Sequence, residues 1–177
     1  GQLTDTEIKA VSIEYEGQVA RLNVKPLSQI ALMGVLRPQL DTVNMVNAPF
    51  LAKERGLDVS EIRHEREGAF NTLVRVTVET SAGPRSVAGT LFGTEAPRLV
   101  EIFGIGIEAE LSGHMLNIVN DDKPGFIGRI GTLLGNHGIN IGTFNLGRRE
   151  AGGEAVLLLS LDEELTPEVV AEAERVD

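Results

Sequence analysis

Residues 120–128 read Asn-Asp-Asp-Lys-Pro-Gly-Phe-Ile-Gly, and this stretch decides the fold of the C-terminal part of the chain. Pro124 suits the first turn of a helix, where its missing N–H costs nothing. Asp122 comes just before it, and its carboxylate is placed to cap that helix by accepting from unpaired backbone N–H groups. The stretch therefore predicts a corner at which a strand turns into a helix.

The same corner suits a small zwitterion. A ligand carboxylate can face the unpaired N–H groups of the helix start, while Asp122 and side-chain amides take an ammonium and a hydroxyl group. Capping is the commoner use of an aspartate at such a position. The residues of this stretch by themselves leave both interpretations open.

The flanking sequence follows a strand-helix-strand-strand-helix order. One more strand would complete a split βαββαβ unit, and we expect it beyond Asp177. The predicted elements are a strand at 114–119, a loop at 120–123, a helix at 124–137, a strand at 140–148, a turn at 150–153, a strand at 154–161 and a helix at 167–175.

The predicted helix at 124–137 carries glycines on one face, at Gly128, Gly131 and Gly135. Each glycine costs roughly 0.5–1 kcal/mol relative to alanine inside a helix. The pattern therefore predicts the close approach of another backbone, either the sheet beneath or a neighbouring subunit. Gly138 then ends the helix, which places Asn140 at a strand end where its side chain can reach a ligand.

The N-terminal part combines helices and strands. Alternating apolar and polar residues predict a strand at 8–17, and residues 19–25 alternate similarly. Proline and glycine positions bound two helices, and Ser112-Gly113 is the best boundary before the C-terminal part. The predicted helices are 27–36, with Leu27, Ile30, Ala31 and Leu32 on one face, and 43–55, with Val46, Leu51 and Ala52 inward; the further strands are 59–64, 72–79, 86–92, 99–103 and 105–111.

Composition and charge exclude several classes of function. The 177 residues carry a net charge of -10 without a basic run, which argues against nucleic-acid binding. The absence of cysteine excludes disulfides and thiolate chemistry. The longest apolar runs, at 30–36 and 155–159, are far shorter than the ~20 residues that cross a bilayer. With no signal peptide at the start, we expect a cytoplasmic protein without a membrane partner.

No pattern predicts catalysis, a metal or a nucleotide in this chain. The histidines His64, His114 and His137 lack metal-ligand spacing. Residues 104–109 fit a relaxed G-x-G-x-x-A fingerprint, but no βαβ unit surrounds them, so a tight hairpin is expected. Arg148-Arg149 could grip a phosphate, but we expect an exposed strand end beside an acidic turn. The chain is therefore expected to have no catalytic residue, no metal and no cofactor of its own.

Several blocks in fixed order resemble the C-terminal regulatory region of bacterial D-3-phosphoglycerate dehydrogenases. Residues 122–125, 138–141 and 147–155 look like its ACT domain, and residues 46–56 and 89–93 resemble the intervening allosteric-substrate-binding domain of the longer members. The resemblance implies an α+β chain. Its parts would be an α/β intervening domain at 1–112 and a ferredoxin-like βαββαβ ACT domain at 113–177 that lacks its last strand.

In the family that the chain resembles, the ACT domain binds L-serine and slows an NAD-dependent enzyme by feedback. The resemblance implies effector contacts at Asn120 and Asp122 on the loop and at Asn140 on the next strand. Asn120 stands where some members have His or Tyr. ACT domains of the family pair into one eight-stranded sheet, so a homodimer is implied, with Asn140 reaching the serine held by the other subunit. Higher oligomers are implied for the parent.

Two alternatives stay open at this point. The small subunit of an iron–sulfur L-serine dehydratase also couples such an intervening domain to an ACT domain, although no Ser/His-rich substrate motif is seen here. A free-standing amino-acid-sensing ACT protein is the other. Because the chain starts at Gly1 without a methionine and stops abruptly at Asp177, we expect a piece of a longer protein.

Overall fold

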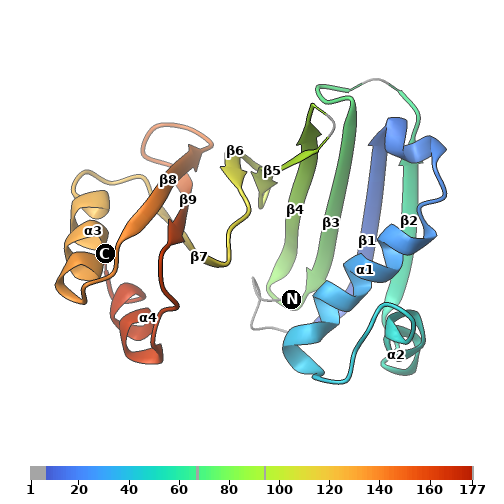
Figure 1. Ribbon diagram of the computed structural model, residues 1–177, viewed down its shortest axis with the longest axis horizontal. Coiled ribbons are helices and arrows are strands. Elements are labelled where there is room, and N and C mark those ends of the chain that lie inside the picture. Colours follow the sequence, from blue (N-terminus) through green and yellow to red (C-terminus); the bar gives the residue numbers. More distant parts are fainter. Residues whose placement is uncertain (1–6, 67, 94, 177) are drawn as a thin grey trace. The chain divides into compact units, whose positions relative to one another are not determined.

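The computed structural model describes residues 7–66, 68–93 and 95–176 (Figure 1). Its contacts divide the chain into two compact units, a first unit from Gly1 to Gly104 and a second unit from Ile105 to Asp177. The domain boundary that the sequence predicts after Ser112 stays a prediction. Within the described residues, no helix combines the length and the apolar character that crossing a membrane requires.

A large, mostly antiparallel sheet forms the first unit. The sheet order is β2-β1-β3-β4-β5-β6, in which β1 and β2 run parallel, and its last strand β6 belongs to the second unit. Each predicted strand from 59 to 111 is confirmed within a few residues. The strands are β1 (Ile8–Gly17), β2 (Asp58–His64), β3 (Thr72–Thr80), β4 (Gly83–Phe92), β5 (Ala96–Ile102) and β6 (Ile105–Glu110).

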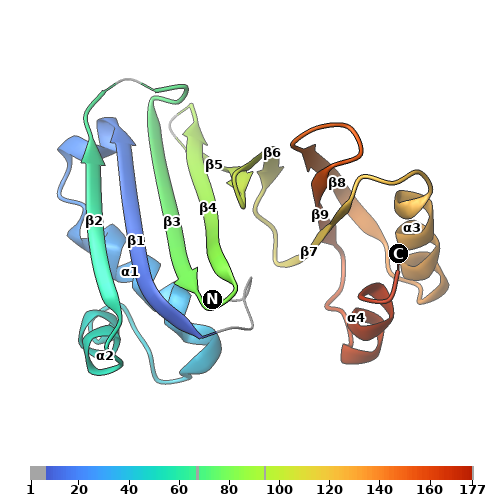
Figure 2. The same ribbon diagram turned by 180° about the vertical axis from the view of Figure 1, so that it is seen from behind.

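Helices α1 (Lys25–Leu36) and α2 (Ala48–Glu54) cover one face of this sheet, and the view from behind shows the opposite face (Figures 1 and 2). The apolar face predicted for α1 is buried only in part, because Leu27 and Ile30 are exposed. The buried stripe holds Ser28, Leu32, Val35 and Leu36 at helical spacing. Ser28 is accepted in the core because its hydroxyl is hydrogen-bonded to Tyr15 and Glu61.

Two local predictions in the first unit are wrong. Residues 19–25 do not form a strand. A 3-10 turn spans Gln18–Arg21 instead, and it buries the adjacent residues Val19 and Ala20 together, which a strand would place on opposite faces. The second helix starts at Ala48 rather than at residue 43. The residues expected to form its first turn are held in a non-helical turn by the side chain of Asn44, whose Oδ1 accepts from the backbone amides of Val46 and Asn47. Val46, which was expected inside, is consequently 79% exposed.

The second unit has the predicted βαββα order. Its antiparallel sheet has the order β7-β9-β8, and both helices pack on one face around Ile130, Leu134 and Leu157, which are all at most 1% exposed (Figure 1). The α+β fold class is confirmed. The elements are β7 (His114–Asp121), α3 (Phe126–Asn136), β8 (Ile141–Arg148), β9 (Glu154–Leu161) and α4 (Pro167–Ala173).

The other face of this sheet is approached by β6. Gly147 lies opposite Val156 on that face, and a Cβ added to Gly147 would overlap the backbone oxygen of Gly106 and come within 3.0 Å of Ile105 Cγ2. The residues Ile105, Ile107 and Ala109 are buried at alternate positions of β6. Glycine at 147 is therefore required by the close approach of the β6 backbone.

Candidate functional site

Asp122 does not cap α3 as predicted. The residue before the helix is Gly125, in a left-handed conformation with φ of 89°, and none of the described side chains caps the first turn. The carboxylate of Asp122 turns instead toward the end of β8. Its Oδ2 accepts from Arg148 Nη1 at 2.6 Å and from the backbone amide of Gly152 at 3.4 Å. The first turn of α3 thus lacks the side-chain acceptor that was expected from Asp122.

These two donors keep Asp122 ionised. The hydrogen bond from the Arg148 guanidinium, followed by that from the Gly152 amide, lowers the pKa of the Asp122 carboxyl below its ordinary value. The side chain of Asp122 is 24% exposed and that of Arg148 is 53% exposed, so the pair is open to a ligand from solvent. Sequence reasoning missed Arg148 as a site residue, although the strand end beside Asp122 was correctly expected to be exposed.

Asn120 lies inside β7 rather than in the predicted loop, and it is half-buried. It shares one face of the sheet with Arg148, since both residues lie opposite Ala155. Its Nδ2 donates to the carbonyl of Asp121 at 2.7 Å. Its Oδ1 is buried and has no hydrogen-bond partner among the described residues. A buried acceptor without a partner costs folding free energy unless a donor binds to it. The end of β7 is therefore a place where a ligand donor could bind.

Asn140 lies just before β8 and is exposed, as predicted. Its partner is not visible in any sequence pattern, because Asn140 Nδ2 donates to Asp162 Oδ2 at 2.7 Å. The Asp162 amide in turn donates to the carbonyl of Asn140 at 3.3 Å. Asn140 is therefore already held in place by a residue 22 positions further along the chain.

The three predicted contact residues fall at two opposite ends of the sheet. The register pairs Asp121 with Glu154 and Arg148 with Ala155 at one end, and Ile141 with Leu161 at the other. The eight residues of β8 separate the two ends by about 23 Å. Within one chain, Asn140 cannot touch a small ligand that is held by Asp122. Asn120 and Asp122 are brought to the same end, and Asn140 is not.

The glycine face of α3 has no close neighbour among the described residues. A Cβ added to Gly128, Gly131 or Gly135 would meet no atom within 4 Å outside the helix. Of the two partners expected for these glycines, the sheet beneath does not approach them, because Phe126, Ile130 and Leu134 occupy the buried side of α3. The other partner, a neighbouring subunit, stays a prediction.

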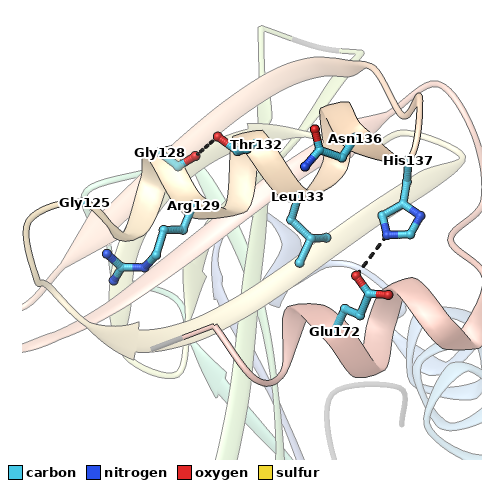
Figure 3. Close-up of a pocket in the computed structure, with 8 residues that line it drawn as sticks. All are labelled: Gly125, Gly128, Arg129, Thr132, Leu133, Asn136, His137 and Glu172. Carbon is cyan, nitrogen blue, oxygen red and sulfur yellow. Dashed lines mark hydrogen bonds and ion pairs between the residues drawn. The ribbon is translucent and has the colours of Figure 1, made fainter.

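A groove of about 550 Å³ runs between α3 and α4, and of the three glycines Gly128 lines it (Figure 3). Thr132 Oγ1 donates to the carbonyl of Gly128 along its wall, and His137 Nε2 meets Glu172 Oε2 at 3.0 Å across it. Asn120, Asp122 and Asn140 do not line this groove. Its lining residues are Gly125, Gly128, Arg129, Thr132, Leu133, Asn136, His137 and Glu172.

The first unit holds its own polar groups on the sheet face away from the helices. Arg75 of β3 donates from Nε and Nη2 to both oxygens of Glu101 at 3.1 Å, and from Nη1 to Glu14 Oε2 at 2.6 Å. His64 Nε2 lies 3.1 Å from the other oxygen of Glu14. Ala88 lies between Arg75 and Glu101 in the register, and its small side chain leaves room for the long one. These carboxylates are satisfied by residues of the same chain.

Both parts of the chain match models of known protein families. A family model described as the D-3-phosphoglycerate dehydrogenase intervening domain matches residues 1–103, and an ACT domain model matches residues 114–177.

Curated relatives cover nearly the whole chain. A D-3-phosphoglycerate dehydrogenase of Bacillus subtilis is 38% identical over 170 residues, which are 96% of this chain and 32% of the relative. One from Methanocaldococcus jannaschii is 32% identical over 99% of this chain and 33% of its own length, and one from Archaeoglobus fulgidus is 34% identical over 96% and 33%. The chain thus spans about a third of the length of these relatives.

Proposed function

The chain belongs to the family of D-3-phosphoglycerate dehydrogenase intervening domains and continues into an ACT domain, and from this premise we propose that it is the regulatory part of such an enzyme. In this proposal residues 1–112 are the intervening domain and residues 113–177 the ACT domain. The parent would oxidise the 2-hydroxyl of 3-phosphoglycerate with NAD, in the first step of serine synthesis. Its nucleotide and substrate domains would lie in the two thirds of the relatives that this chain does not cover.

The effector in this proposal is L-serine, bound at the end of β7. Asp122 supplies an ionised carboxylate for the ammonium group, and its two hydrogen bonds leave Oδ1 facing the ligand. The buried Oδ1 of Asn120 accepts from the serine hydroxyl. The first turn of α3, which no described side chain caps, offers backbone N–H groups to the serine carboxylate. The unpartnered Asn120 oxygen beside an ionised aspartate is the observation that carries the proposal.

A second copy of the chain completes the site. Strand β8 is at the edge of the sheet that the described residues form, with β9 as its neighbour in the strand order, so its other side presents unpaired backbone groups. Antiparallel pairing of β8 with its copy about a two-fold axis sets the start of one strand beside the end of the other. Asn140 of one chain then approaches Asp122 of the other. The 23 Å separation within one chain is the reason for proposing a homodimer with two effector sites.

The experiment is a calorimetric titration of the chain with L-serine, D-serine and glycine. We expect L-serine to bind best, and Asn140→Ala to weaken it roughly five- to 150-fold, which corresponds to an unpaired ligand group. Because Asn140 is also bonded to Asp162, the matched control is Asp162→Ala, which removes the same internal hydrogen bond and keeps the amide. That control should bind L-serine nearly as wild type does.

Either of two results would contradict the site. L-serine could bind no better than glycine, or Asn140→Ala and Asp162→Ala could weaken it equally. Sedimentation tests the dimer separately, since a strict monomer at high micromolar concentration with bound L-serine would contradict the site shared between two chains.

A further inference from the structure

Arg148 is the cationic side chain that bonds Asp122, the residue of the proposed ammonium site. It is the last residue of β8 and donates from Nη1 to Asp122 Oδ2 at 2.6 Å. The neighbouring Arg149 is directed elsewhere, because its Nε lies 3.4 Å from Glu154 Oε2. Of the two adjacent arginines, Arg148 is thus the one that faces Asp122.

Both hydrogen bonds to the Asp122 carboxylate end on the same oxygen. Arg148 and the Gly152 amide both donate to Oδ2, which restricts the movement of the carboxylate. A ligand ammonium can therefore take Oδ1 without displacing Arg148. The guanidinium group has five N–H donors in a planar fork, and the bond to Asp122 uses one of them. A carboxylate attached next to that ammonium would lie within the reach of this fork.

We propose that Arg148 is a specificity-determining residue of the effector site, which orients Asp122 and binds the ligand carboxylate together with the first turn of α3, so that the Asp122–Arg148 pair selects a free α-amino acid. This inference rests on the proposed function. A free α-amino acid carries its ammonium and carboxylate on one carbon, and the site offers a carboxylate and a guanidinium group side by side. Because the net charge is -10, an anionic group must be held by a local device, and a guanidinium group at the site is one such device.

The test compares L-serine with ethanolamine, which is serine without its carboxylate and keeps its ammonium charge at neutral pH. Dissociation constants are measured by calorimetry and, for weak binding, by ligand-observed NMR on the 177-residue chain. In wild type we expect ethanolamine to bind far more weakly than L-serine. Arg148→Gln should weaken L-serine roughly 10- to 100-fold and ethanolamine much less, so that the preference for serine collapses. The matched control is Arg149→Gln, whose side chain is equally exposed, and it should change neither constant.

A second readout does not depend on a variant. The Nε–H signal of Arg148 in a proton–nitrogen spectrum should shift when L-serine saturates wild type, and it should stay in place with ethanolamine. The inference is overturned if Arg148→Gln binds L-serine as tightly as wild type, if it weakens both ligands in proportion, or if the Nε–H signal does not respond to L-serine. If wild type binds no L-serine at all, the proposed function fails first and this inference falls with it.

Discussion

The two units treat their polar side chains in opposite ways. In the first unit, Arg75 is surrounded by Glu14 and Glu101 and makes three hydrogen bonds to them. In the second unit, Asp122 uses one oxygen only, and the buried Oδ1 of Asn120 has no partner among the described residues. Saturated polar groups stabilise a fold, whereas unsaturated ones cost free energy until a ligand arrives. The partly buried charges of the first unit are thus paired within the chain, and the groups left open in the second unit are those of the proposed effector site.

Removing Arg75 should give the largest effect on stability. Arg75→Met would leave Glu101 unpaired and Glu14 with His64 as its partner, at side-chain exposures of 23% and 22%, which should cost about 2–4 kcal/mol of unfolding free energy. Tyr15 is the single tyrosine of a chain without tryptophan, so its fluorescence during urea denaturation follows the first unit. Adding Glu14→Gln and Glu101→Gln should recover most of the loss. A single variant as stable as wild type would show that the network is not stabilising.

Tyr15→Phe should have a smaller effect. The Tyr15 hydroxyl and Ser28 Oγ are 2.8 Å apart in the core, and Ser28 also donates to Glu61, so one hydrogen bond of about 1 kcal/mol is lost. Burial raises the pKa of Tyr15 above its ordinary value of 10.0. A group with a raised pKa contributes fully below its unfolded pKa and loses that contribution as pH rises through the folded one. Wild type should therefore lose its advantage over Tyr15→Phe above about pH 10, as followed by circular dichroism; a constant difference up to pH 11 would contradict this.

Gly131→Ala should stabilise the second unit. The added Cβ meets nothing within 4 Å, and alanine in a helix gains roughly 0.5–1 kcal/mol over glycine. Chemical denaturation at low micromolar concentration would measure the gain. Gly147→Ala is the matched control, since its Cβ would overlap the Gly106 backbone and should destabilise the same unit. A loss for Gly131→Ala that grows with protein concentration would indicate that a second copy packs on this face.

His137→Gln should give the smallest effect. His137 and Glu172 join α3 to α4 at side-chain exposures of 35% and 48%, and such pairs contribute only a few tenths of a kcal/mol. Thermal unfolding at low salt should show a slight loss that disappears in about 1 M salt because of screening. A loss that salt leaves unchanged would indicate packing of the imidazole ring rather than an ion pair.

The regular elements could be predicted from the sequence because one physical signal dominates each of them. Alternation revealed β1, with Val11 and Ile13 buried, and turn residues bounded the βαββα order of the second unit. The failures occur where side chains bond to nearby backbone. Asn44 and Asn47 bond to each other's backbone amides and delay α2, and no periodicity reveals such a turn.

The candidate site was less predictable, because its residues are related through partners far away in the chain. The types and approximate positions of Asn120, Asp122 and Asn140 could be derived from the corner at Pro124 and from a family resemblance. The partners Arg148 and Asp162 lie 26 and 22 positions from Asp122 and Asn140, and only the registers of β7 and β8 with β9 bring them together. Whether the three residues contact L-serine stays a prediction.

The packing of β6 against Gly147 has a practical consequence for the design of shorter fragments of the chain. A fragment that begins at Ile105 keeps the strand that lies over Gly147 and Val156 on the helix-free face of the small sheet. A fragment that begins at Gly113 lacks this strand and presents Val156 and Leu158, which are 0% and 4% exposed in the intact chain, to water. Such a fragment would have a newly exposed apolar surface. The shorter fragment is thus the one prone to aggregate, although it contains every residue of the βαββα unit.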